Sequence, residues 1–173
     1  MLFIAGIKHS GKTTFAKLLA EKYKLPHIDN DQLILEFLKI DNIRQFYKAE
    51  GKAMFMQAEA LALASFLDRR EDAVISLGGG AADNEQLITL LKITAPIIYL
   101  YRKEEDLLEC ILKDGIPPFL DKEDVENSFH RLFEQRDKRY REISDLTINL
   151  GPYADIDTTF KLILSQIGSF YAR

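Results

Sequence analysis

The sequence contains very little cysteine and no long apolar run. Its single cysteine, Cys110, cannot form an internal disulfide, which agrees with a protein that works in a reducing compartment. The opening apolar residues, 1–6, are too few for a signal-peptide core or a membrane span, and no later run reaches that length. We therefore expect a cytoplasmic protein with no membrane partner.

An excess of positive charge is also missing. The 173 residues include 23 lysines and arginines against 27 aspartates and glutamates, a formal net charge of -4 at pH 7. Because nucleic-acid binding needs a basic surface, this balance argues against a nucleic-acid partner. The length and the ordinary share of apolar residues, 47%, predict one globular domain over residues 1–173, and we expect a monomer.

Short apolar runs alternate with longer segments of helical period along the whole chain. This alternation is typical of an α/β protein with a parallel sheet. The expected strands are 2–5, 27–28, 73–77, 96–101 and 146–150. The expected helices are 12–23, 31–39, 43–67, 85–91, 104–113, 122–141 and 155–170. Asp31 and Asp155 are suited to begin their helices as N-caps.

One segment, at about residues 114–122, fits neither pattern. It contains Gly115, Pro117 and Pro118, which disfavour helix and predict a loop between two helices. Enzymes that bind ATP often close a loop over it to exclude water, so this segment is a candidate lid. An ordinary helix-to-helix connection explains the same residues.

The most specific motif is Gly6-Ile-Lys-His-Ser-Gly-Lys-Thr13, a complete G-x-x-x-x-G-K-[ST] between the first strand and the first helix. Its two glycines let successive backbone N–H groups converge on a phosphate at the positive end of the helix dipole. We expect Lys12 to meet the β- and γ-phosphates and Thr13 to bind magnesium. The sequence therefore predicts a site for ATP and Mg2+, with nucleotide contacts from Gly6, Lys8, His9, Ser10, Gly11, Lys12, Thr13 and Thr14.

Two further groups of residues follow expected strands and are candidates for the acceptor site. Asp29 and Asp31 follow the second strand; one carboxylate can hold magnesium and the other can orient or deprotonate a substrate hydroxyl. Asp31 can equally be only an N-cap. The glycines 78–80 follow the third strand and leave backbone N–H groups open to a ligand, although a tight turn also explains them.

A cationic stretch, Arg136-Asp-Lys-Arg-Tyr-Arg141, precedes the last expected strand. An arginine can bind a carboxylate or phosphate through two parallel hydrogen bonds, so one of these residues is a candidate for an anionic substrate group. The others are expected to be surface charge.

Taken in order, these motifs resemble the shikimate kinase family. The matching series runs from the P-loop through Asp29-x-Asp31, Glu50-Gly51 with Phe55 and Glu59, Val74-Ile-Ser-Leu-Gly-Gly-Gly80, Ile98-Tyr-Leu100 and Arg136-x-x-x-Tyr140. The resemblance implies a three-layer P-loop NTPase fold whose five-stranded parallel sheet has the order 2-3-1-4-5. It also implies transfer of the ATP γ-phosphate to a hydroxyl of a small metabolite, shikimate.

The same resemblance assigns roles to particular residues. Asp29 would help to hold Mg2+, and Asp31 would act as base or orienter. With the P-loop residues these assignments make Lys12 and Asp31 catalytic and Thr13 and Asp29 the magnesium ligands. The acceptor would be bound by Asp31, Gly78, Gly79, Gly80 and Arg136, with Arg136 gripping its carboxylate.

Three positions depart from the family pattern. Met56, Cys110 and Pro117 stand where the family has arginines for the acceptor carboxylate, the adenine and the phosphates. A carboxylate that loses one of two arginines loses a contact of about 1.5 to 3 kcal/mol. These departures leave two alternatives open, a related kinase for a different, less anionic hydroxylated acceptor and a non-catalytic ATP-binding protein. A nucleoside monophosphate kinase is disfavoured because its phosphate acceptor needs lid arginines.

Overall fold

The centre of the computed structural model, which describes residues 1–117 and 120–172, is a five-stranded sheet. Its strands are β1 (Leu2–Ala5), β2 (His27–Asp29), β3 (Val74–Ser76), β4 (Ile97–Tyr101) and β5 (Leu146–Asn149). Neighbouring strands pair in parallel in the order β2-β3-β1-β4-β5, which confirms the predicted fold and strand order. The carboxyl ends of β1, β2 and β3 therefore meet at one edge of the sheet.

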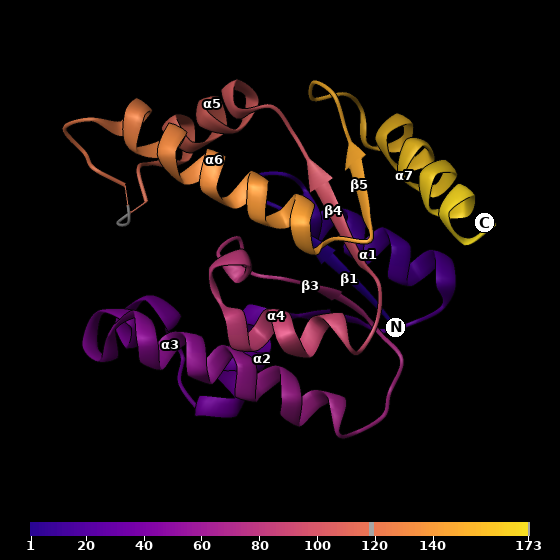
Figure 1. The fold of residues 1–173 in the computed structure, drawn as a ribbon, viewed down its shortest axis with the longest axis horizontal. Coiled ribbons are helices and arrows are strands. Elements are labelled where there is room, and N and C mark those ends of the chain that lie inside the picture. Colours follow the sequence, from indigo (N-terminus) through magenta and orange to yellow (C-terminus); the bar gives the residue numbers. More distant parts are fainter. Residues whose placement is uncertain (118–119, 173) are drawn as a thin grey trace.

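Helices cover both faces of the sheet (Figure 1). They are α1 (Lys12–Tyr23), α2 (Asn30–Leu38), α3 (Ile43–Leu67), α4 (Glu85–Lys92), α5 (Glu104–Asp114), α6 (Val125–Ile143) and α7 (Ile156–Tyr171). Alternate residues of a strand point to opposite faces, so Phe3 and Ala5 join the core under α3, α4 and α6, whereas Leu2 and Ile4 join the core under α1 and α7. The predicted three layers are thus confirmed. In the part of the chain that is described, no helix is long and apolar enough to cross a membrane.

Two helices differ from the prediction. The helix expected over 43–67 is interrupted at Gly51, whose φ of 81° and ψ of 176° are not helical. Glycine reaches this conformation without steric cost, so α3 consists of two helical segments that meet there. The helix expected from residue 122 begins later, at Val125, because the Asp121 side chain accepts a hydrogen bond from the Glu123 N–H (2.9 Å) and holds a turn.

The start of α2 corrects the prediction that Asp31 is its N-cap. The N-cap is Asp29, whose Oδ1 accepts a hydrogen bond from the Asp31 N–H at 3.0 Å. The Asp31 side chain is therefore not needed to cap the helix. Asp155 caps α7 as predicted, because it accepts a hydrogen bond from the Thr158 N–H at 2.8 Å.

The candidate lid joins α5 to α6. Pro118 and Phe119, two of its residues, lie outside the described residues. On its far side Leu120 is buried, and its N–H donates to the Pro117 carbonyl at 3.1 Å. The helix-to-helix connection is confirmed, and the lid role stays a prediction.

Candidate active site

The P-loop links β1 to α1 and forms a tight turn of backbone. His9 and Gly11 have positive φ values of 69° and 88°, and a Cβ on Gly6 would lie 2.2 Å from Ser10 Oγ. Gly11 is the N-cap of α1, yet no side chain caps this helix and no acidic residue lies in its first turn. The N–H groups of that turn are therefore available to an anion, which the helix dipole also attracts.

The other predicted nucleotide contacts surround this turn. Ser10 is buried, Lys8 and His9 are half-buried, and Thr14 is exposed. Burial and the nearby Lys8 lower the pKa of His9, so its contact with Asp114 (3.6 Å) involves a mainly neutral imidazole at neutral pH. His9 is therefore a weak candidate for a phosphate-binding cation.

Lys12 is the cation that the loop presents beside the two aspartates. Burial lowers the pKa of Lys12, whereas Asp31 and Asp29 raise it. The effect of burial is the larger one, so the pKa of Lys12 is lowered overall. Negative phosphate charge next to this ammonium group would stabilise its charged form. The position of Lys12 suits binding of a polyphosphate.

Asp29 faces the P-loop across β3. Its Oδ2 accepts a hydrogen bond from Ser76 Oγ at 2.9 Å and one from Thr13 Oγ1 at 3.5 Å. In the sheet β3 lies between β2 and β1. Ser76 of β3 is in register with Asp29, and its hydroxyl holds the Asp29 carboxylate on the side of the P-loop. His27 Nε2 lies 3.1 Å from the same Ser76 hydroxyl and extends this polar chain, which the sequence did not reveal.

The donor atoms of Thr13 and Asp29 suit magnesium, which prefers hydroxyl and carboxylate oxygens. Among the described residues no group of three or more His, Cys, Asp or Glu side chains can hold a metal ion. Magnesium usually binds through one or two protein oxygens together with substrate phosphates, so a pair of oxygens beside a phosphate cradle fits this ion.

The glycine loop after β3 lies between three functional elements. A Cβ on Gly78 would lie 3.1 Å from Asp31 Oδ1, and one on Gly79 would lie 3.2 Å from the backbone nitrogen of Lys8. A Cβ on Gly80 would lie 3.1 Å from Arg136 Nη2. The lack of side chains here thus allows the P-loop, the acidic pair and α6 to converge.

Asp31 and Arg136 therefore lie on either side of this loop. Asp31 is exposed as a residue, but the protein atoms crowded around its carboxyl group desolvate it and raise its pKa; the neighbouring Asp29 raises the pKa further, and Lys12 lowers it. Arg136 is nearly buried and pairs with Asp83 at 2.9 Å. Tyr140, one turn after Arg136, donates to the carbonyl oxygens of Gly78 and Gly79, each at 3.3 Å.

A buried polar cluster under the glycine loop was not predicted as part of the site. Glu59 is 2% exposed; its Oε2 accepts from Asn84 Nδ2 at 2.9 Å and its Oε1 from Asn30 Nδ2 at 3.4 Å. A Cβ on Gly78 would lie 3.4 Å from Glu59 Oε1, so the cluster lies against the loop. The sequence feature that could have indicated this cluster is an acidic residue within the apolar stretch Ala58-Glu-Ala-Leu-Ala-Leu63.

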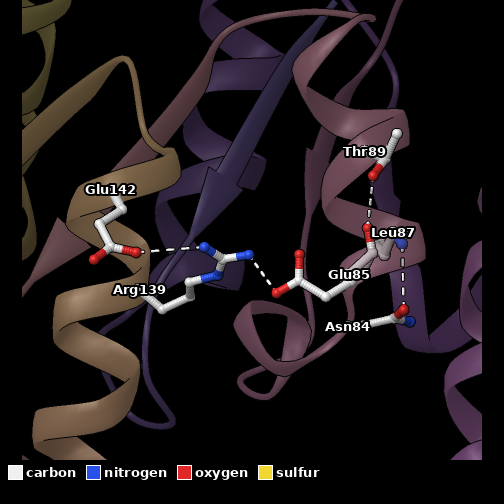
Figure 2. Close-up of polar contacts among 6 residues, drawn as sticks. All are labelled: Asn84, Glu85, Leu87, Thr89, Arg139 and Glu142. Carbon is white, nitrogen blue, oxygen red and sulfur yellow. Dashed lines mark hydrogen bonds and ion pairs between the residues drawn. The ribbon is translucent and has the colours of Figure 1, made fainter.

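Burial is the main reason that the pKa of Glu59 is raised to about 7, while the hydrogen bonds from Asn84 and Asn30 lower it. Asn84 also donates to the Met56 carbonyl at 2.7 Å and caps α4 through Leu87 (Figure 2). The cluster therefore fixes α3 and α4 beneath the glycine loop.

Comparisons with known proteins agree with this geometry. The model of the shikimate kinase family matches residues 8–166. The chain is 32% identical to the shikimate kinase of Stenotrophomonas maltophilia (strain K279a) over 163 residues, which are 94% of this chain and 89% of that protein. It is 30% identical to the shikimate kinase of Francisella tularensis subsp. novicida (strain U112) over 169 residues, 98% and 93% of the two chains.

A solved structure, the shikimate kinase from Acinetobacter baumannii in complex with shikimate, is similar with a TM-score of 0.84 and 30% identity. The match covers 97% of this chain and 92% of that one. Family and fold thus agree along nearly the whole length of the chain. The chain belongs to the shikimate kinase family, a family of ATP-dependent small-molecule kinases.

Proposed function

We propose that this kinase transfers the γ-phosphate of ATP to a hydroxyl of shikimate. The observation that carries the proposal is the convergence at the glycine loop. Asp31, the P-loop and Arg136 all lie within contact distance of positions 78–80. A hydroxylated ring on this loop would have a carboxylate at one end of it and a guanidinium at the other. The shikimate in the Acinetobacter baumannii relative supports this choice of acceptor.

The P-loop would bind the nucleotide. The N–H groups of the first turn of α1 would bind phosphate oxygens, and Lys12 would neutralise charge on the β- and γ-phosphates. Thr13 and Asp29 would hold Mg2+, which offsets negative charge on the phosphate oxygens when it is bound. Gly6, Lys8, His9, Ser10, Gly11 and Thr14 would shape the rest of this cradle.

Asp31 would orient the acceptor hydroxyl. As the oxygen–phosphorus bond to the acceptor forms and the bond to ADP breaks, the hydroxyl proton would pass to the Asp31 carboxylate. Backbone N–H groups of Gly78, Gly79 and Gly80 would contact the ring hydroxyls, and Arg136 would bind the acceptor's carboxylate.

The test is shikimate-dependent ADP formation, followed in parallel with formation of the phosphorylated product. We expect Asp31→Asn to lower kcat about a hundredfold or more, with ATP affinity nearly unchanged. Glu36→Gln, an exposed change on the same helix α2, is the matched control and should keep wild-type rates. Normal turnover by the Asp31 variant would contradict the proposed role of this carboxylate.

One observation favours a second acceptor class, an uncharged polyol or a less anionic hydroxy acid. Met56 supplies no positive charge, and the remaining arginine, Arg136, is already paired with Asp83. ADP formation with neutral polyols but not with shikimate would favour this class.

A further inference from the structure

Asp83 is an acidic residue of the site to which the proposed reaction gives no role. It ends a short 3-10 helix, η1 (Ala81–Asp83), directly after the glycine loop. Its Oδ2 lies 2.9 Å from Arg136 Nη2, and the two side chains are 14% and 10% exposed. The same Nη2 atom lies 3.1 Å from the position of a Cβ on Gly80. Asp83 thus binds the nitrogen of Arg136 that faces the glycine loop.

An acceptor carboxylate that reaches Arg136 beside Gly80 must share this nitrogen with Asp83 or replace Asp83 there. Two carboxylates against one guanidinium repel each other, and solvent screens such a nearly buried group of charges only weakly. Asp31 adds negative charge on the other side of the loop, where its Oδ1 lies 3.1 Å from the position of a Cβ on Gly78. At Arg136 a carboxylate-bearing acceptor therefore meets a repulsion from Asp83 that an uncharged acceptor does not.

The surroundings also offer a place for a displaced Asp83 side chain. Asp83 lines a hollow of about 340 Å3 whose walls include Lys52, Lys138 and Arg139. Arg139 already pairs with Glu85 of α4 and with Glu142, as Figure 2 shows. The two lysines leave this hollow basic enough to accept a carboxylate that turns away from Arg136.

We propose that Asp83 is a specificity-determining residue that competes with the acceptor's carboxylate for Arg136. Its charge lowers the affinity of this kinase for carboxylate-bearing acceptors and leaves the affinity for uncharged acceptors unchanged. The inference rests on the proposed function, because it takes Arg136 to be the group that binds the acceptor's carboxylate.

The experiment compares the wild type with Asp83→Asn, which removes the charge but keeps an oxygen that can accept from Arg136. Affinities for shikimate and for its uncharged methyl ester are measured by calorimetry in the presence of a non-hydrolysable ATP analogue. We expect Asp83→Asn to bind shikimate about tenfold more tightly, with no change for the ester. Glu85→Gln is the matched control, because it removes a nearby charge that pairs with Arg139 instead, and it should change neither affinity.

The possible outcomes separate this inference from the proposed function. Unchanged or weaker shikimate binding by Asp83→Asn overturns it, and so does an equal gain in Glu85→Gln or an equal gain for the ester. Asp83→Ser is a second variant if Asp83→Asn does not fold, and unchanged or weaker shikimate binding by this variant overturns the inference as well. Tighter binding without ADP formation by either protein would overturn the proposed function and leave the role of Asp83 standing.

Discussion

Replacing Glu59 with glutamine should make the protein more stable at high pH. The carboxyl group of Glu59 is buried under the glycine loop, and its pKa is raised from 4.5 to about 7, mainly by burial. A raised pKa in the folded state means that the folded protein binds the proton more tightly than the unfolded chain does. The contribution of Glu59 is therefore most favourable below pH 4.5 and is lost as the pH rises through about 7.

The difference between the two pKa values corresponds to about 3 kcal/mol of folding free energy. Glutamine has no charge to bury, and its oxygen can still accept the hydrogen bond from Asn84. In the wild type Asn30 Nδ2 faces Glu59 Oε1, so the Asn30 amide must turn over for its Oδ1, which is buried and has no hydrogen-bond partner within the described residues, to accept from the glutamine N–H2 group. The substitution thus removes the charge and keeps the packing of the cluster.

The assay is urea unfolding of the wild type and Glu59→Gln at pH 5 and at pH 8. From pH 5 to pH 8 the wild type should lose up to about 3 kcal/mol of unfolding free energy relative to the variant. Only the wild type has a buried carboxyl group that must ionise as the pH rises. Glu36→Gln, on the exposed side of α2, should give no such change. An identical pH dependence in wild type and Glu59→Gln would contradict this prediction, since it would mean that Glu59 ionises in the folded protein as readily as in water.

Three further substitutions test the site. Lys12→Ala should weaken binding of Mg·ATP tenfold or more, since a charge-assisted phosphate contact is lost, and unchanged affinity by calorimetry would contradict the phosphate cradle. Arg136→Lys should raise the KM for the acceptor with little effect on the KM for ATP, because a point charge replaces a planar fork; equal effects on both would place Arg136 at the nucleotide. Met56→Arg should lower the KM for shikimate roughly tenfold, or about 1.4 kcal/mol, and a KM that does not fall would argue for an uncharged acceptor.

Much of this protein could be predicted from short stretches of sequence. The P-loop is specified by local spacing, since its glycines and the following helix create the same turn wherever they occur after a strand. The alternation of strands and helices predicted the parallel sheet, and the resemblance to the shikimate kinase family predicted its strand order. Asp29, Asp31 and the glycine loop were expected together because parallel strands end at one edge of the sheet.

Other features depended on where neighbouring elements end or on contacts between distant ones. Asp29 rather than Asp31 caps α2 because β2 extends one residue further than predicted, to Asp29, and the helix begins directly after it, at Asn30. The break at Gly51 occurs within a sequence that is otherwise of helical period, so local propensity did not reveal it.

The acceptor side of the site was decided by tertiary packing. Arg136 and Asp83 are 53 residues apart in the sequence, and Glu59 and Asn84 are 25 apart. Their pairing requires α6, η1 and α3 to pack around a loop of three glycines, and no spacing in the sequence encodes that contact. Local sequence is enough to specify a phosphate-binding turn, because that turn depends on the backbone of one short segment. The charges around the proposed acceptor position depend on the folded core, because they come from separate helices that only the core brings together.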